Sequence, residues 1–87
     1  MSNKEKNFFR YIGKYLNNDG KIDKLSIRDL VIQFYNRNFK DYTLSELYKY
    51  LNDWNFYSDG EFDYSKMPIE YLCLLPQRIF KKVYGTV

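Results

Sequence analysis

The stretch Thr43–Tyr64, TLSELYKYLNDWNFYSDGEFDY, decides the fold because a helical and an extended hydrophobic pattern meet in it. The Thr43 hydroxyl can accept a hydrogen bond from a free amide of the first turn, and Glu46 can reach back to the Thr43 amide, which together form a capping box. Apolar residues then recur at helical spacing and predict a helix over 43–54. They are Leu44, Leu47, Tyr48, Leu51 and Trp54.

The second half of the stretch predicts a β-hairpin over 55–64. Asp59 and Gly60 lie between two aromatic-rich runs, and both residue types tolerate the positive φ angles of a type I′ turn. A two-residue turn there sets Tyr57 opposite Phe62, and we expect this pair to face the core. The opposite face, expected to lie towards solvent, holds Phe56, Ser58, Glu61 and Asp63.

Three further elements are predicted before this unit: a helix over 3–16, a short strand over 21–25 and a helix over 26–36. Capping-box residues mark both helix starts: Ser2 and Glu5, Ser26 and Asp29. Gly13 lies inside the first helix, where glycine costs about 1 kcal/mol relative to alanine. We therefore expect Gly13 to mark either a close contact or a weak point of the helix.

A helical segment over 68–84 is predicted after the hairpin. Pro68 suits its first turn, where the missing amide costs nothing, and Gly85 is a suitable terminator. Pro76 must either kink the segment or begin a second short helix, because proline cannot donate the amide hydrogen bond of a helix interior. Thr86 and Val87 are expected to fray.

The composition indicates one small domain. A chain of 87 residues supports a single core, and its 21% aromatic content lets few side chains bury much area. The lone Cys73 has no partner for an internal disulfide and lies in an apolar run, so we expect a structural role in a reducing compartment. No apolar run reaches the roughly 20 residues that span a bilayer. We expect a cytoplasmic protein with no membrane partner.

The order helix, short strand, helix, helix, hairpin over about residues 3–64 resembles the winged helix-turn-helix superfamily. The expected class is therefore mainly α with a small β-hairpin (α+β), a winged-helix-like single domain with an extra C-terminal helix. The resemblance implies that 43–54 is a DNA recognition helix and 55–64 a wing. The residues that would contact DNA are Ser45, Lys49 and Asn52 at the bases, with either Arg37 and Lys40 or the basic first and last helices at the phosphates.

The distribution of charge disagrees with that implication. Residues 1–42 carry a net charge of +4 and residues 71–87 a net charge of +3, whereas residues 43–70 carry −4. An acidic recognition helix and wing would repel phosphates. The carboxylates either solubilise an aromatic-rich surface or form an acidic, Tyr-rich face that docks on a basic protein. The candidate docking residues are Glu46, Tyr50, Asp53, Phe56, Asp59, Glu61 and Asp63.

The residues present do not favour catalysis or metal binding. The sequence has no histidine, the commonest general base and metal ligand, so the usual serine or cysteine triad cannot be assembled. The run Asn17–Ile22 is similar to the middle of an EF-hand loop, but the positions of its two key carboxylates hold Tyr15 and Ser26. We expect no enzymatic activity, no metal and no cofactor.

The sequence therefore favours a small non-enzymatic protein-binding module. In type it is similar to the short inhibitors that phages and mobile elements encode, including anti-CRISPR proteins, with a basic, nucleic-acid-handling protein as the expected partner. Such an inhibitor would act in the host cytoplasm if it is phage-encoded. The alternative is a winged-helix transcriptional regulator that binds double-stranded DNA. The aromatic faces leave a homodimer as a third hypothesis.

Overall fold

Three helices pack against one another in the computed structural model, which describes residues 1–85. They are α1 (Asn3–Gly13), α2 (Ile27–Asn38) and α3 (Leu44–Asp53). An antiparallel hairpin of β1 (Tyr57–Ser58) and β2 (Glu61–Phe62) follows α3. The expected class, mainly helical with a small hairpin, is confirmed.

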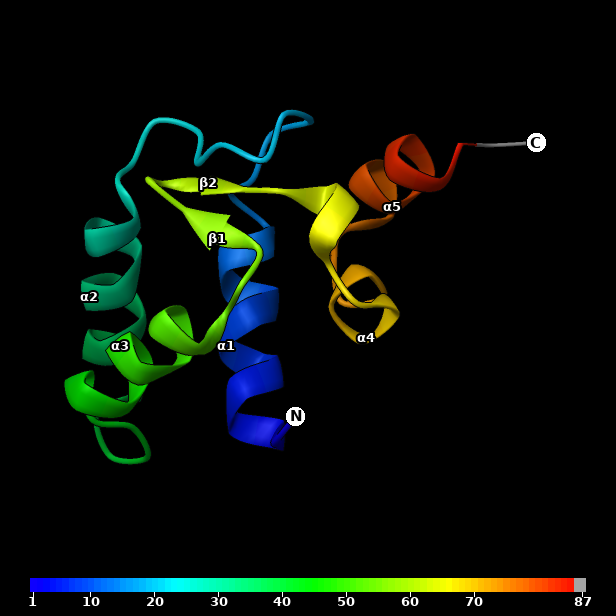
Figure 1. Ribbon diagram of the computed structural model, residues 1–87. Coiled ribbons are helices and arrows are strands. Elements are labelled where there is room, and N and C mark those ends of the chain that lie inside the picture. Colours follow the sequence, from blue (N-terminus) through cyan, green and yellow to red (C-terminus); the bar gives the residue numbers. More distant parts are fainter. Residues whose placement is uncertain (86–87) are drawn as a thin grey trace.

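The C-terminal part of the chain covers the side of α1 that α2 leaves open (Figure 1). It consists of the 3-10 turn η1 (Tyr64–Lys66), α4 (Ile69–Leu72) and α5 (Gln77–Tyr84). Pro76 precedes α5 directly, so it begins a second helix rather than kinking one, and Gly85 ends that helix with a φ of 69°. Thr86 and Val87 lie outside the described residues, and within residues 1–85 no helix is long and apolar enough to span a membrane.

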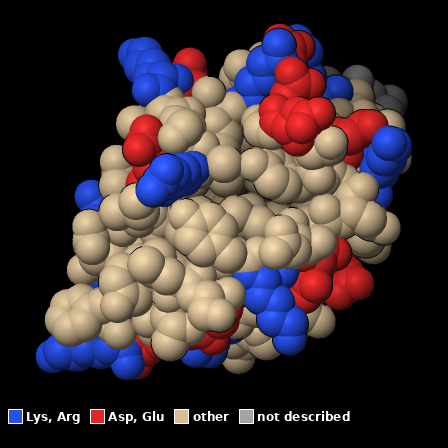
Figure 2. Space-filling view, turned by 60° about the vertical axis from the view of Figure 1, so that its left-hand side comes forward, with Lys and Arg blue, Asp and Glu red and all other residues tan. Residues whose placement is uncertain are grey.

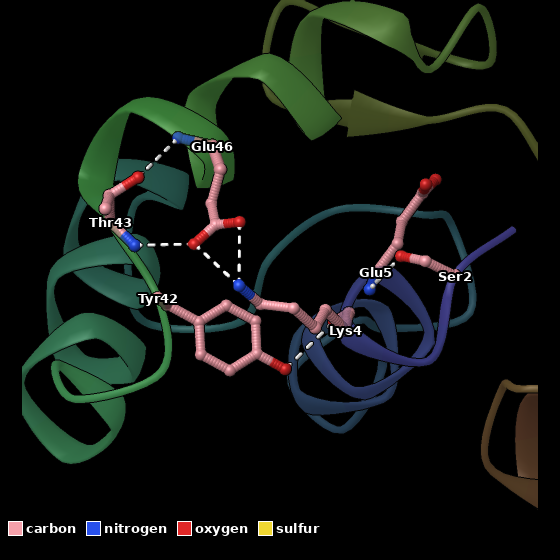
Figure 3. Close-up of polar contacts among 6 residues, drawn as sticks. All are labelled: Ser2, Lys4, Glu5, Tyr42, Thr43 and Glu46. Atoms are coloured by element: carbon pink, nitrogen blue, oxygen red, sulfur yellow. Dashed lines mark hydrogen bonds and ion pairs between the residues drawn. The ribbon is translucent and has the colours of Figure 1, made fainter.

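The capping boxes predicted for α2 and α3 are confirmed. At α3 the Thr43 amide donates to Glu46 Oε1 at 2.7 Å, and the Glu46 amide donates to Thr43 Oγ1 at 3.2 Å (Figure 3). At α1 only half of the box forms, because the Glu5 carboxylate turns inward instead of back to Ser2. It accepts hydrogen bonds from Trp54 Nε1 at 2.8 Å and from the Tyr71 hydroxyl at 2.6 Å.

The first helix ends at Gly13, three residues earlier than predicted. The Asn17 side chain accepts hydrogen bonds from the amides of Asp19 and Lys21, which forms a tight turn directly after the helix. Leu16 pairs with Ile22 across this turn as an isolated bridge. The side-chain hydrogen bonds of Asn17 thus compete successfully with helix continuation.

The strand predicted over 21–25 does not form at that length. Lys21 makes one antiparallel bridge to Glu61 of β2, and Lys24 then turns the chain with a φ of 66°. The Phe62 amide donates to the Gly20 carbonyl at 2.8 Å, which fixes the segment between α1 and α2 beside the hairpin.

The hairpin has the predicted turn and register. Asp59 and Gly60 have φ values of 53° and 81°, and Tyr57 pairs with Phe62. The solvent-facing position predicted for Phe56 is wrong, because Phe56 is only 3% exposed. The Tyr57 amide donates to the Trp54 carbonyl, so the chain turns before β1 and does not keep the two-residue alternation of a strand.

The core is dominated by aromatic rings gathered around α1. Phe9 is fully buried, and its ring makes edge contacts with Trp54 and Tyr71, each at 5.1 Å between centroids. Phe56 and Phe62 complete the ring cluster around it at 6.0 and 6.1 Å. Aromatic pairs in such edge arrangements contribute roughly 0.5–1.5 kcal/mol beyond the burial of their area.

Gly13 and Cys73 differ in their exposure to solvent. Gly13 is buried, and a Cβ built on it would lie 3.5 Å from side-chain atoms of Leu75 and Pro76, so Gly13 marks a close contact between α1 and the start of α5. Cys73 is exposed rather than packed in the core, and its expected role as an unreactive thiol in a reducing compartment stays a prediction. The four-residue helix α4 buries Leu72 and turns the next residue outward.

Candidate interaction surfaces

The hairpin carboxylates line an open hollow of about 610 Å³. Asp59, Glu61 and Asp63 contribute to its lining, as the predicted acidic face requires. The loop after α1 adds Asp19, which the sequence pattern did not single out as part of this face. Asp19 is distant from the hairpin in the sequence and comes close through the bridge between Lys21 and Glu61, so no local signal could have identified it.

Lysines neutralise three of the predicted docking carboxylates. Ion pairs join Lys4 to Glu46 at 2.9 Å, Lys21 to Glu61 at 3.4 Å and Lys66 to Asp63 at 3.8 Å. Lys4 lies on α1 and Lys21 in the following loop, so tertiary structure supplies the countercharge for two of them. Within the described part of the chain, the docking carboxylates without an ion pair are Asp53 and Asp59, together with the additional Asp19.

Hydrogen bonds also lower the pKa values of two of these carboxylates, Glu46 and Asp63. The Lys4 ammonium, and then the Thr43 amide, lower the pKa of Glu46 (Figure 3). The Ser65 hydroxyl lowers the pKa of Asp63, because both the hydroxyl and the amide of Ser65 donate to its Oδ1. Glu46 and Asp63 are therefore engaged in capping local structure, which reduces their availability to a partner.

Of the two aromatic residues in the predicted docking set, Phe56 is buried and Tyr50 is half-buried. Phe56 belongs to the core and cannot contact a partner without unfolding. Tyr50 is half-buried, and its ring lies 6.2 Å from that of Phe8 on α1, so Tyr50 offers only an edge to the surface. The hairpin face is acidic in part, but it is not rich in accessible tyrosine.

The alternative DNA-contacting residues are all exposed. Ser45, Lys49 and Asn52 form a stripe along one side of α3, and the exposed Asp53 follows Lys49 by one turn on the same side. Glu46 turns away from this side towards Lys4 (Figure 3). Arg37 and Lys40 lie at the end of α2 and in the loop after it. The Arg37 guanidinium is placed 6.0 Å from the Tyr11 ring centroid, which directs it towards α1 and away from the α3 stripe.

The sequence pattern missed a second surface, which we call the α2–α3 face. It consists of Ile32, Phe39, Leu44 and Tyr48, which are 39%, 58%, 39% and 38% exposed. Ile32 and Phe39 are seven residues apart, and Leu44 and Tyr48 four residues apart, so each pair lies on one side of its helix. Figure 2 looks onto this side of the molecule and shows uncharged side chains across its middle with charged ones around them.

Tyr64 packs next to the hollow, and its raised pKa predicts how the stability of the protein depends on pH. Its hydroxyl donates to the Asn17 carbonyl at 2.6 Å, and burial raises its pKa to about 12. A tyrosine in the unfolded chain ionises near pH 10, so the neutral phenol of the folded state stabilises the protein fully below pH 10. This contribution is expected to be lost as the pH rises from about 10 to about 12.

The measurement is urea unfolding of the wild type and of Tyr64→Phe at pH 9 and at pH 11.5. We expect the wild type to lose more of its unfolding free energy between these pH values than Tyr64→Phe does, because the substitution removes the ionisable group. An equal loss in both proteins would contradict the assignment of the raised pKa to Tyr64.

The described residues do not assemble a metal centre. Within residues 1–85, no group of three or more Cys, Asp or Glu side chains lies close enough to hold a metal ion. The Glu5 carboxylate accepts hydrogen bonds from Trp54 and Tyr71, which join α1 to the end of α3 and to α4. Burial, and then the hydrogen bond to Glu5, raise the pKa of Tyr71.

No family model matches the chain, and no curated protein or solved structure matches it either.

Proposed function

We propose that this chain is a small non-enzymatic module that binds another protein through the α2–α3 face. The observation that carries the proposal is the exposure of four large apolar side chains, Ile32, Phe39, Leu44 and Tyr48, on two adjacent helices. Contiguous exposed apolar surface is typical of protein interaction sites, and aromatic residues near its centre supply most of the binding energy. Phe39, 58% exposed, is the expected anchor.

The proposed partner combines an apolar patch with a basic border. Asp59 lies with Ile27 and Tyr57 around a shallow hollow at the start of α2, and Asp53 ends α3. Both carboxylates are exposed and have no ion pair within residues 1–85, so they can attract Lys or Arg on the partner. Proteins that handle nucleic acid carry such basic surfaces. An inhibitor of a protein of this kind, as the sequence suggests, is the role that we propose.

The test begins with a photo-reactive amino acid in place of Tyr48, introduced in the cells that produce the protein. The partner that crosslinks is then purified and titrated by calorimetry with unmodified protein, with Phe39→Asp and with Ile69→Asp. Ile69 is the matched control, because it is 54% exposed but lies on α4, away from the α2–α3 face. We expect Phe39→Asp to weaken binding about 100-fold, typical of a lost anchor, and Ile69→Asp to have little effect.

Two results would refute the proposal. The first is equal weakening by both variants, since that would show a general effect of the added charge. The second is crosslinking only to a second copy of the chain, which would assign the face to a homodimer.

DNA binding by a winged helix is the second candidate, and two observations favour it. The bridge between Lys21 and Glu61 adds the segment after α1 to the hairpin, where winged helices have a third strand. The outer stripe of α3, Ser45, Lys49 and Asn52, carries hydrogen-bonding and basic groups, beside the single exposed carboxylate of Asp53. The short acidic hairpin tip at Asp59 counts against a wing that follows the phosphate backbone.

A further inference from the structure

The fold brings the basic first and last helices together. Arg78 of α5 donates from Nη2 to the Leu16 carbonyl at 2.7 Å and to the Lys14 carbonyl at 3.4 Å, just beyond the end of α1. Leu75 and Pro76 lie against the same end of the helix, at Gly13. Two segments more than 60 residues apart in the sequence therefore share one surface.

Five basic side chains occupy this surface, which we call the basic ridge. They are Arg10 and Lys14 on the outer side of α1 and just after it, and Arg78, Lys81 and Lys82 on α5. All five are exposed. Within residues 1–85 none of them forms an ion pair, since the ion pairs of the described chain use Lys4, Lys21 and Lys66.

The two helices that form the ridge contain a single carboxylate, and it points away from the ridge. Glu5 is the acidic residue of α1, and its carboxylate points inward to Trp54 and Tyr71. The helix α5 contains no acidic residue. A chain with a net charge of only +3 thus concentrates positive charge on one side, opposite in sign to the hairpin.

We propose that the basic ridge binds the phosphate backbone of nucleic acid. Closely spaced Lys and Arg side chains without intervening carboxylates are the footprint of phosphate contacts, which give affinity without sequence preference. A hollow of about 400 Å³ extends the ridge, and its lining includes Lys14, Lys24 and Arg78 as well as Asp23. The proposal does not depend on the α2–α3 face and assigns a second surface to the protein.

The packing of α5 favours nucleic acid over an anionic membrane. A basic amphipathic helix binds a membrane by inserting its apolar side between the lipids. In α5 that side is already used, because Ile79 is fully buried and Phe80 and Val83 pack against the core. The ridge offers charge to a partner but little apolar surface for insertion.

The experiment measures fluorescence anisotropy of a labelled mixed-sequence DNA duplex titrated with the whole protein over a series of salt concentrations. If the five side chains contact phosphates, the logarithm of the binding constant should fall against the logarithm of salt concentration with a slope of about −4.5. The triple variant Arg10→Glu, Lys81→Glu, Lys82→Glu should bind much more weakly and show a slope smaller by about three. Arg78 stays unchanged because it holds α5 against α1.

The matched control is Arg28→Glu, compared with Lys82→Glu. Both change the net charge by the same amount at an exposed position without an ion pair within residues 1–85, and Arg28 is not among the residues of the basic ridge, the α2–α3 face or the α3 stripe. We expect Lys82→Glu to reduce the slope by about one and Arg28→Glu to keep the wild-type slope. Circular dichroism checks that all variants remain folded.

Three outcomes would overturn the proposal. No binding by the wild type at low salt would exclude a phosphate-contacting surface. Equal weakening by Arg28→Glu and Lys82→Glu would show an effect of net charge alone. Binding of phosphatidylserine vesicles as tight as that of DNA would show a surface for anionic membranes.

Discussion

Replacing Phe9 with alanine is expected to lower the free energy of unfolding by about 3–5 kcal/mol, the usual cost of removing a buried phenylalanine. Phe9 is fully buried, and its ring contacts rings from α3, the hairpin and α4. The substitution leaves a cavity where these elements meet. For a domain of this size such a loss is a large part of the total stability. Urea unfolding followed by tryptophan fluorescence measures it, since Trp54 borders the cavity.

Phe39→Ala is the control for this prediction. It removes the same atoms from a side chain that is 58% exposed, so its expected cost is below about 1 kcal/mol. Comparable destabilisation by the two substitutions would contradict the central position of Phe9 in the core.

Gly20→Ala is the second substitution expected to have a large effect. Gly20 has a φ of 81°, where an L side chain costs roughly 1–2 kcal/mol. A Cβ at this position would also overlap the carbonyl oxygen of Phe62, whose backbone is fixed in β2. Displacing packed structure to relieve such an overlap adds roughly 1–3 kcal/mol. We expect Gly20→Ala to destabilise the protein by about 2–5 kcal/mol in urea unfolding.

Gly60→Ala separates the two contributions. Gly60 has the same φ of 81°, but a Cβ built there would have no neighbour within 4 Å. Its expected cost is therefore the conformational part alone, roughly 1–2 kcal/mol. If both substitutions had equal effects, the close approach of Gly20 to Phe62 would not contribute to stability.

Local signals in the sequence predicted the helix starts and the hairpin correctly. The capping boxes at Ser26 and Thr43 and the turn at Asp59 each depend on residues within a few positions of one another. Such interactions are nearly independent of the rest of the fold, so sequence patterns are enough to identify them. The winged-helix resemblance goes further than these signals and stays a prediction.

Features that depend on distant contacts were not predictable in the same way. Phe56 was assigned to the surface by strand alternation, but the turn before β1 directs it to Phe9 and Tyr71. The acidic character of residues 43–70 was overestimated, because Lys4 and Lys21 reach it from elsewhere in the chain. The same limitation hid the α2–α3 face, which exists only because α1 packs on one side of both helices and not on the other.

The anchoring of α5 on α1 has a consequence for synthesis of the protein on the ribosome. The helix α1 is synthesised well before the residues that hold it. Tyr71 contacts Glu5, which lies 66 residues earlier, and Arg78 contacts Leu16 and Lys14, which lie 62 and 64 residues earlier. Until those residues leave the exit tunnel, Phe9 and Gly13 have only part of their final surroundings. The native packing around Phe9 and Gly13 is therefore completed only after Arg78 has left the exit tunnel.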